Sequence, residues 1–160
     1  MRLLPIALAL IPLTACASPR VGALPADNGL LPVVVITWCG DAPAQVDVTS
    51  SGISLHYRPV APLEGAEVEL DLTEPGPGWV REAGISDGGR ESILRPYAED
   101  MEVVVTVSSE ATSGDRNGSG DIGTVDFTLK ELAEAAAVLV YDEDVNRNEE
   151  VPRGEFALRC

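Results

Sequence analysis

The sequence predicts a mostly β fold, an antiparallel β-sandwich preceded by an exported N-terminal segment. Three observations predict it: short alternating runs of apolar and polar residues, turn residues between the runs, and a length that suits one domain. The chain has 160 residues, of which 45% are hydrophobic and only 4% are aromatic. A chain of this size buries a substantial core, so Val, Leu, Ile and Ala must supply most of it.

Short runs with a period of two support the strand prediction. At residues 66–72, apolar residues at even positions alternate with acidic residues at odd positions, which suits a strand with one wet face. The same reading predicts strands near residues 33–38, 45–49, 53–57, 66–72, 103–107, 125–129, 138–141 and 156–158, and one short helical turn over 129–134. About eight or nine short strands separated by turn residues favour an antiparallel sandwich.

Residues 1–15 have the three parts of an export signal. Arg2 precedes an apolar run that ends in small residues, and the run is shorter than the roughly 20 residues that span a bilayer. Leu13-Thr14-Ala15-Cys16 resembles the bacterial lipobox. That resemblance implies a diacylglyceryl group on the thiol of Cys16, cleavage before it, and anchoring to the outer side of the cell membrane by its fatty acyl chains, palmitate among them.

A second interpretation of this region stays open. Ala15-Cys16-Ala17 also fits a signal-peptidase site, which would release a soluble protein. The cysteine count favours the lipoprotein, because three cysteines in an oxidising compartment leave one unpaired. Lipidation of Cys16 accounts for the odd cysteine, and Cys39 and Cys160 are then expected to form a disulfide that closes nearly the whole domain.

The expected disulfide conflicts with the expected strands. If each strand runs antiparallel to the next, Cys39 and Cys160 lie at opposite ends of the sandwich, whereas a disulfide needs Cα atoms within about 7 Å. Either one strand prediction is therefore wrong or one connection crosses over, and the weak segment near residues 79–81 is the suspected cause. The expected organisation is a signal peptide over 1–15, a lipidated flexible tether over 16–31 and a single β-sandwich domain over 32–160.

The chain is strongly acidic, with 26 acidic and 11 basic residues and a net charge of −15. Removal of residues 1–15 takes away Arg2 and no acidic residue, which makes the net charge −16. Such a field repels a phosphate backbone, so nucleic acid is excluded as a partner. Divalent cations and basic partners remain compatible with it.

Residues 115–126 resemble a calcium loop of the EF-hand kind. Oxygen-bearing side chains stand at positions 1, 3, 5, 7 and 12 of such a loop, with Gly at position 6: Asp115, Asn117, Ser119, Asp121 and Asp126. The resemblance implies Ca²⁺ as the one candidate cofactor. Flanking helices are not evident, and a polar hairpin loop is the alternative interpretation.

A second acidic segment, residues 142–150, reads as a solvated hairpin. The two segments predicted between it and the loop at 115–126 reverse the chain twice. Both acidic loops are therefore expected at the same end of the sandwich, where their charge would suit a cation or a basic partner.

The sequence predicts no catalytic constellation. His56 is the only histidine, and it lies on the polar face of its predicted strand, where a solvated side chain is expected rather than a general base. Any Ser-His-Asp site would have to use it. The leading hypothesis is a non-enzymatic binding or envelope-associated lipoprotein. The alternatives are a calcium-dependent binding module that uses loops 115–126 and 142–150, and a hydrolase that uses acidic residues.

Two resemblances extend this interpretation. Leu94-Arg95-Pro96 before the alternating valines at 103–107 resembles the corner of a fibronectin type III domain, which implies an immunoglobulin-like sandwich. The lipobox, the general layout and a composition with a single lysine, Lys130, resemble uncharacterised small lipoproteins of actinobacteria. That resemblance implies an extracytoplasmic protein anchored by lipid, with a protein or another envelope component as its partner.

Overall fold

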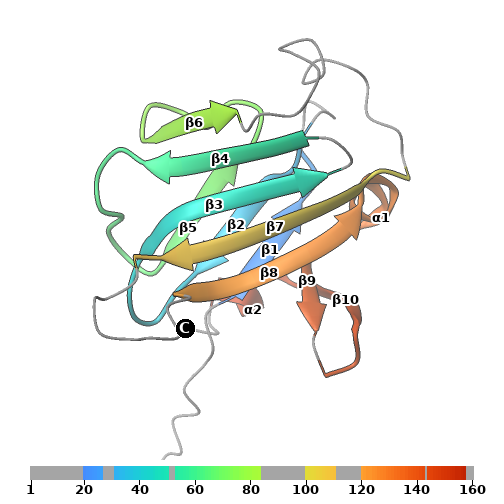
Figure 1. The fold of residues 1–160 in the computed structure, drawn as a ribbon. Helices are drawn as coiled ribbons and strands as arrows, with labels where there is room; N and C mark the ends of the chain where they lie inside the picture. Colours follow the sequence, from blue (N-terminus) through green and yellow to red (C-terminus); the bar gives the residue numbers. More distant parts are fainter. Residues whose placement is uncertain are drawn as a thin grey trace, which may run out of the picture.

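The computed structural model describes residues 20–26, 31–50, 53–83, 100–110, 120–142 and 144–157. These residues form two antiparallel five-stranded sheets packed face to face, as Figure 1 shows. The prediction of a mostly β, antiparallel sandwich is thereby confirmed. The proposed lipidation site Cys16 and the predicted disulfide partner Cys160 lie outside the described residues.

Sheet A has the strand order β10-β9-β1-β2-β5. Its strands are β1 (Arg20–Leu24), β2 (Val33–Thr37), β5 (Glu67–Asp71), β9 (Val138–Asp142) and β10 (Arg147–Val151). Sheet B has the order β6-β4-β3-β7-β8 and lies in front in Figure 1. Its strands are β3 (Pro43–Ser50), β4 (Ile53–Pro59), β6 (Trp79–Ala83), β7 (Glu102–Ser109) and β8 (Asp121–Thr128).

The core lies between the sheets and is filled mainly by aliphatic side chains, as the composition predicts. Alternate residues of β3, β7 and β8 point inward and are buried, which leaves the intervening polar residues on the outer face of sheet B. Tyr57 is one of the few aromatic residues of the core. It is fully buried, and its hydroxyl donates a hydrogen bond of 2.7 Å to the carbonyl oxygen of Leu72.

The expected helical turn is confirmed as α1 (Leu129–Glu134), which begins at a capping box. The hydroxyl of Thr128 accepts from the backbone N–H of Glu131, and the carboxylate of Glu131 accepts from the backbone N–H of Thr128. Leu132 turns into the core and is buried. None of the helices among the described residues has the length and apolar content needed to cross a membrane.

The strand expected at residues 156–158 is wrong. Its described part belongs to α2 (Arg153–Ala157), which starts directly after Pro152, a residue with no N–H to give to a sheet ladder. Phe156 packs fully buried on the outer face of sheet A, against Val35 and Val138. A run of only three apolar residues fits one helical turn as well as a strand, so its pattern could not distinguish the two.

The tether expected over residues 16–31 contains a strand, because residues 20–24 form β1 at the centre of sheet A. β1 pairs with β2 on one side and with β9 on the other. Val21 and Ala23 are buried in the core, and Gly22 lies beneath Val138 and Phe156, where a Cβ atom would collide with Val138 and make a tight contact with Phe156. With both faces covered, β1 shows no polar alternation, and the sequence pattern missed it.

The segment at residues 79–81, which had the weakest pattern, is a true strand. It belongs to β6, which pairs with β4 along the edge of sheet B. The second acidic segment is a hairpin, as predicted: β9 and β10 pair from Asp142 opposite Arg147 to Val138 opposite Val151. Between Cys39 and the end of the chain, the predicted strands left out residues 79–83, which form β6, and residues 147–151, which form β10. They also included residues 156–158, whose described part is helical. The strand count behind the conflict was therefore wrong.

Candidate functional site

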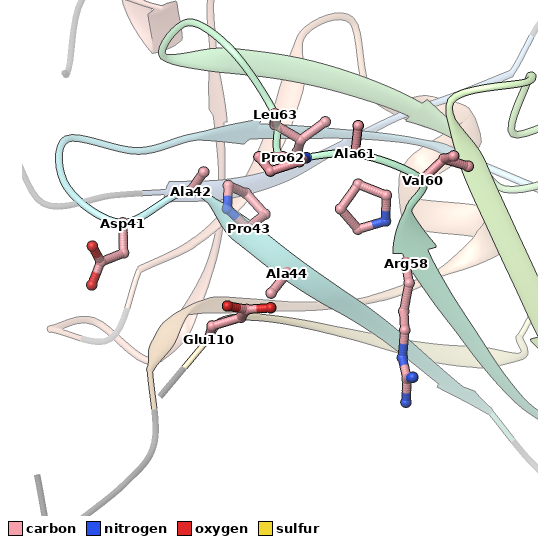
Figure 2. Close-up of a pocket in the computed structure, with 11 residues that line it drawn as sticks. Asp41, Ala42, Pro43, Ala44, Arg58, Val60, Ala61, Pro62, Leu63 and Glu110 are labelled. Carbon is pink, nitrogen blue, oxygen red and sulfur yellow. The ribbon is translucent and has the colours of Figure 1, made fainter. Parts of the chain in front are cut away.

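An apolar recess of about 510 Å³ opens at one edge of the sandwich (Figure 2). We call it the proline recess. It is lined by residues 41–44, 58–63 and Glu110, which come from the β2–β3 connection, the start of β3, the loop after β4 and the end of β7. Its volume lies within the range of small-ligand and side-chain pockets in proteins.

Proline shapes this recess. Pro43, Pro59 and Pro62 all line it, and their rings fix the local backbone, so little conformational freedom is left to lose when a ligand binds. The backbone N–H of Val60 donates to the carbonyl oxygen of Gly78, which ties the loop to the start of β6. The Val60 side chain is nevertheless 64% exposed, an unusual position for a large apolar residue in the described part of the chain.

Charged side chains stand at both ends of the proline recess. Figure 2 shows Arg58 at one end and Asp41 and Glu110 at the other. An apolar group could fill the centre, while a basic group would be attracted to the end that carries the two carboxylates. The sequence pattern did not single out this region, because the lining comes from three separate segments.

The structure describes only residues 120–126 of the first acidic loop, and the start of this stretch lies beside part of the second acidic segment. Residues 146–148 of the second segment line a different recess with residues 126–128, toward the other end of β8. Asp121 at the start of β8, Asp142 at the end of β9 and Asp144 line one open recess together with Arg20. The carboxylate of Asp142 accepts hydrogen bonds from the backbone N–H groups of Asp144, at 2.9 Å, and of Val145, at 3.3 Å. Asp142 therefore stabilises the β9–β10 turn.

The structure does not bring the described members of the expected calcium loop together. Asp126 lies within β8 opposite Val104, five residues after Asp121, and it lines a different recess. Five residues of extended strand separate the two Cα atoms by about 16 Å. Asp115, Asn117 and Ser119 lie outside the described residues.

Metal ligands do not cluster in the described part of the chain, which contains no group of three or more His, Cys, Asp or Glu side chains placed to hold a metal ion. Asp121 and Asp126 are therefore not arranged as the seventh and last ligands of one twelve-residue loop, because pairing of β8 with β7 begins as early as Asp121. The loop as a whole stays a prediction, because its other ligands lie outside the described residues.

The side chain of His56, which was expected to be solvated, contacts two other side chains. Its Nδ1 lies 2.5 Å from Oδ1 of Asp47, and its Nε2 lies 3.4 Å from Oγ of Ser54. The side-chain amide of Gln45 donates to both carboxylate oxygens of Asp47 at 2.8 Å. These four side chains form one hydrogen-bonded array on the outer face of sheet B.

Strand register creates this array. Asp47 on β3 and His56 on β4 are direct cross-strand partners, and Ser54 precedes His56 by two residues, so all three side chains share a face. Ser54-Leu55-His56 is the local signal in the sequence, but Asp47 could be added only with the β3–β4 register.

Comparisons of the chain with protein-family models, curated proteins and solved structures found no match.

Proposed function

We propose that the protein is a membrane-anchored extracytoplasmic lipoprotein whose main role is to bind a partner in the cell envelope. The observation that carries this proposal is the position of β1, which begins at Arg20, four residues after Cys16. Four extended residues span at most about 14 Å. A lipid on Cys16 would therefore hold a folded sandwich directly against the bilayer, as suits a protein that meets its partner at the membrane.

The same geometry supports a position for the partner site. Arg20 pairs with Thr37 at the end of β2, and the short connection at 38–42 leads from there into the proline recess. An anchor on Cys16 would thus place the proline recess at the membrane-facing end. We infer that its occupant is an extracytoplasmic segment of a membrane-embedded protein, with an apolar side chain next to a basic residue. The excess of acidic residues and the pair Asp41 and Glu110 favour the basic group.

Site-specific photo-crosslinking on intact cells tests this proposal. A photoreactive residue replaces Val60 in the full chain, and the matched control replaces Val145, which is 53% exposed at the β9–β10 turn. Position 60 is expected to give a discrete adduct with an integral membrane protein, and position 145 is not. The double variant Asp41→Asn with Glu110→Gln is expected to weaken the adduct. Equal adducts at both positions, or an adduct unchanged in the double variant, would refute the partner site.

Anchoring is tested separately by intact mass spectrometry and fractionation. The wild-type chain is expected in the membrane fraction with a lipidated Cys16 as its first residue, and Cys16→Ser is expected to lose the lipid. A mature chain that begins at Ser18 without lipid would support release as a soluble protein and contradict the anchor.

We also propose the finer fold assignment, an immunoglobulin-like sandwich. In constant-type immunoglobulin domains one sheet holds the first, second, fourth and fifth strands, and the third strand lies in the other sheet with the last two. Here β1, β2 and β5 share sheet A, while β3, β7 and β8 are neighbours in sheet B. The fourth strand departs from this arrangement, because β4 pairs with β3 in sheet B. The β9–β10 hairpin then extends sheet A beyond β1.

The pairing of Cys39 with Cys160 also stays a proposal, which the location of α2 supports. Arg153 of α2 contacts Glu67, whose Cα partner on β2 is Thr37, two residues before Cys39. The last turn of the described chain therefore lies at the same end of sheet A as Cys39. Peptide mapping without reduction is expected to yield one cross-linked peptide pair, and separate peptides would contradict it.

Calcium-dependent binding is the second candidate function. Asp121, Asp142 and Asp144 line the same recess, but they are not placed to hold a metal ion in the described structure. A bound cation would have to draw their carboxylates together. Millimolar Ca²⁺ is expected to raise the melting temperature more than Mg²⁺ does, because a ligand bound only by the folded state stabilises that state. The rise should be smaller in Asp144→Asn and unchanged in Glu134→Gln, a control on α1. Identical melting curves with the two cations would dispose of this candidate.

A further inference from the structure

Asp47, His56 and Ser54 form a hydrogen-bonded chain in the order that serine hydrolases use. The carboxylate of Asp47 contacts Nδ1 of His56 at 2.5 Å, and Nε2 on the far side of the ring lies 3.4 Å from Oγ of Ser54. Such a triad is recognised by the geometry and roles of its members rather than by their order in the chain. We propose that Ser54 is a nucleophile activated by His56 and that it cleaves small carboxylic esters, an activity beyond the binding role proposed above.

The surrounding sheet fixes the orientation of the three side chains. β4 is paired with β3 on one side and with β6 on the other, so the backbone beneath His56 is held on both sides. Gln45 donates to both oxygens of Asp47 and holds the carboxylate in place. With Nδ1 protonated and bonded to Asp47, the lone pair of Nε2 faces the hydroxyl of Ser54. Asp47 is thus a positioning residue, and His56 is the general base.

The reaction balances without a cofactor. Oγ of Ser54 attacks the ester carbonyl carbon while its proton passes to Nε2 of His56. The bond to the alcohol oxygen then breaks, and the alcohol leaves with the proton from Nε2. Water attacks the acyl group on Ser54, gives one proton to Nε2, and the serine oxygen departs with that proton. One ester and one water yield one carboxylic acid and one alcohol, and the protein is regenerated.

The exposure of the array determines the substrate class. The side chains of His56 and Asp47 are 35% and 29% exposed, so an ester carbonyl at Ser54 would lie on a solvated face. Water is a poorly organised donor to the developing oxyanion, and the large electrostatic contribution of a dry site is not available there. General-base catalysis alone accelerates reactions by about 10²–10⁴-fold. Small acyl groups on good leaving groups, such as aryl acetates, are therefore the expected substrates.

The experiment uses the full chain, a fluorophosphonate probe and p-nitrophenyl acetate. The probe is expected to add once, on the peptide that contains Ser54, and Ser54→Ala is expected to abolish both labelling and ester hydrolysis. His56→Gln should slow both by about 10²-fold or more, because the general base is lost. Ser108→Ala, which removes a hydroxyl from β7 in the same sheet, should leave both unchanged.

A separate measurement tests the role of Asp47 as a positioning residue. Asp47→Asn is expected to lower the labelling rate by roughly tenfold or more, because the amide favours the wrong tautomer of His56, and Asp47→Glu should restore part of it. Melting temperatures of all variants show whether each one is folded.

A folded wild-type chain that is not labelled at Ser54, or labelling of Ser54 that proceeds equally fast in folded His56→Gln, would overturn the proposal. Either result would leave the binding proposal intact, because crosslinking at position 60 tests that independently.

Discussion

The hydroxyl of Tyr57 on β4 reaches across the core to the carbonyl oxygen of Leu72, just beyond the end of β5, and thereby joins the two sheets through one buried hydrogen bond of 2.7 Å. Both residues are fully buried. Elsewhere the contact between the sheets consists mainly of aliphatic side chains, so this bond contributes directionality that those contacts lack.

Tyr57→Phe is expected to destabilise the protein by about 1–3 kcal/mol, because it leaves a buried carbonyl without this donor. Urea denaturation followed by circular dichroism measures the change. The matched control is Tyr141→Phe, which removes an exposed hydroxyl that donates to Asn146 at 2.7 Å. The free energy of unfolding of the control should stay within about 0.5 kcal/mol of the wild type. Equal losses of stability in the two variants would contradict a special contribution of the buried hydrogen bond.

Gly22→Ala is expected to cost about 1–3 kcal/mol through overpacking. A Cβ at this position meets Val138, Phe156 and the backbone of β9, and the centre of the sheet has little room to shift. Gly154→Ala on α2 provides the control, because a Cβ there meets nothing and alanine favours a helix. Thermal melts should show a lower midpoint for the first variant only. Equal melting midpoints in the two variants would contradict the packing of β1 beneath α2.

Phe156→Ala should destabilise the protein far more than Arg153→Ala, although both residues fix α2 to sheet A. A fully buried aromatic side chain is worth about 3–5 kcal/mol. The contacts of Arg153 with Glu67 and Glu69 are partly exposed, and such ion pairs contribute only about 0–1 kcal/mol. Chemical denaturation measures the loss of stability in each variant. Only the loss in Arg153→Ala should depend on salt concentration, because salt screens ion pairs. The larger loss in Arg153→Ala would contradict an apolar basis for α2 docking.

Thr128→Ala removes one half of the capping box of α1 and is expected to cost about 1 kcal/mol. Differential scanning calorimetry detects a loss of this size as a lower melting temperature. Lys130→Ala, at an exposed position of the same helix, should leave that temperature nearly unchanged. A comparable drop in both variants would point to helix propensity rather than the cap.

Strands with one solvent-exposed face, and the apolar runs of β2 and β9, could be predicted from the sequence, whereas β1 and β10 could not. The alternation at residues 66–72 predicted β5 because Leu70 faces the core while Glu69 faces solvent. β1 is covered on both faces, and four of the five residues of β10 are polar, so neither presents that signal. Which faces of these two strands are buried depends on segments distant in the sequence, and a local pattern does not record that.

The candidate sites also differ in how far the sequence could predict them. Counting chain reversals predicted that Asp121 lies near Asp142, and the two do share a recess. It did not predict that residues 146–148 lie toward the other end of β8. The array at His56 needed the β3–β4 register, which a pattern of alternating residues leaves undetermined by any even shift. The proline recess is built from three separate segments and had no local signature in the sequence.

The central place of β1 has a mechanical consequence. Any pull on the chain ahead of Arg20 acts along a strand that is hydrogen-bonded to β2 on one side and to β9 on the other. Because ladder hydrogen bonds run perpendicular to their strands, such a force loads many of them at once in shear, rather than opening them one after another. A tethered copy of this domain would resist extraction by force through the middle of its sheet.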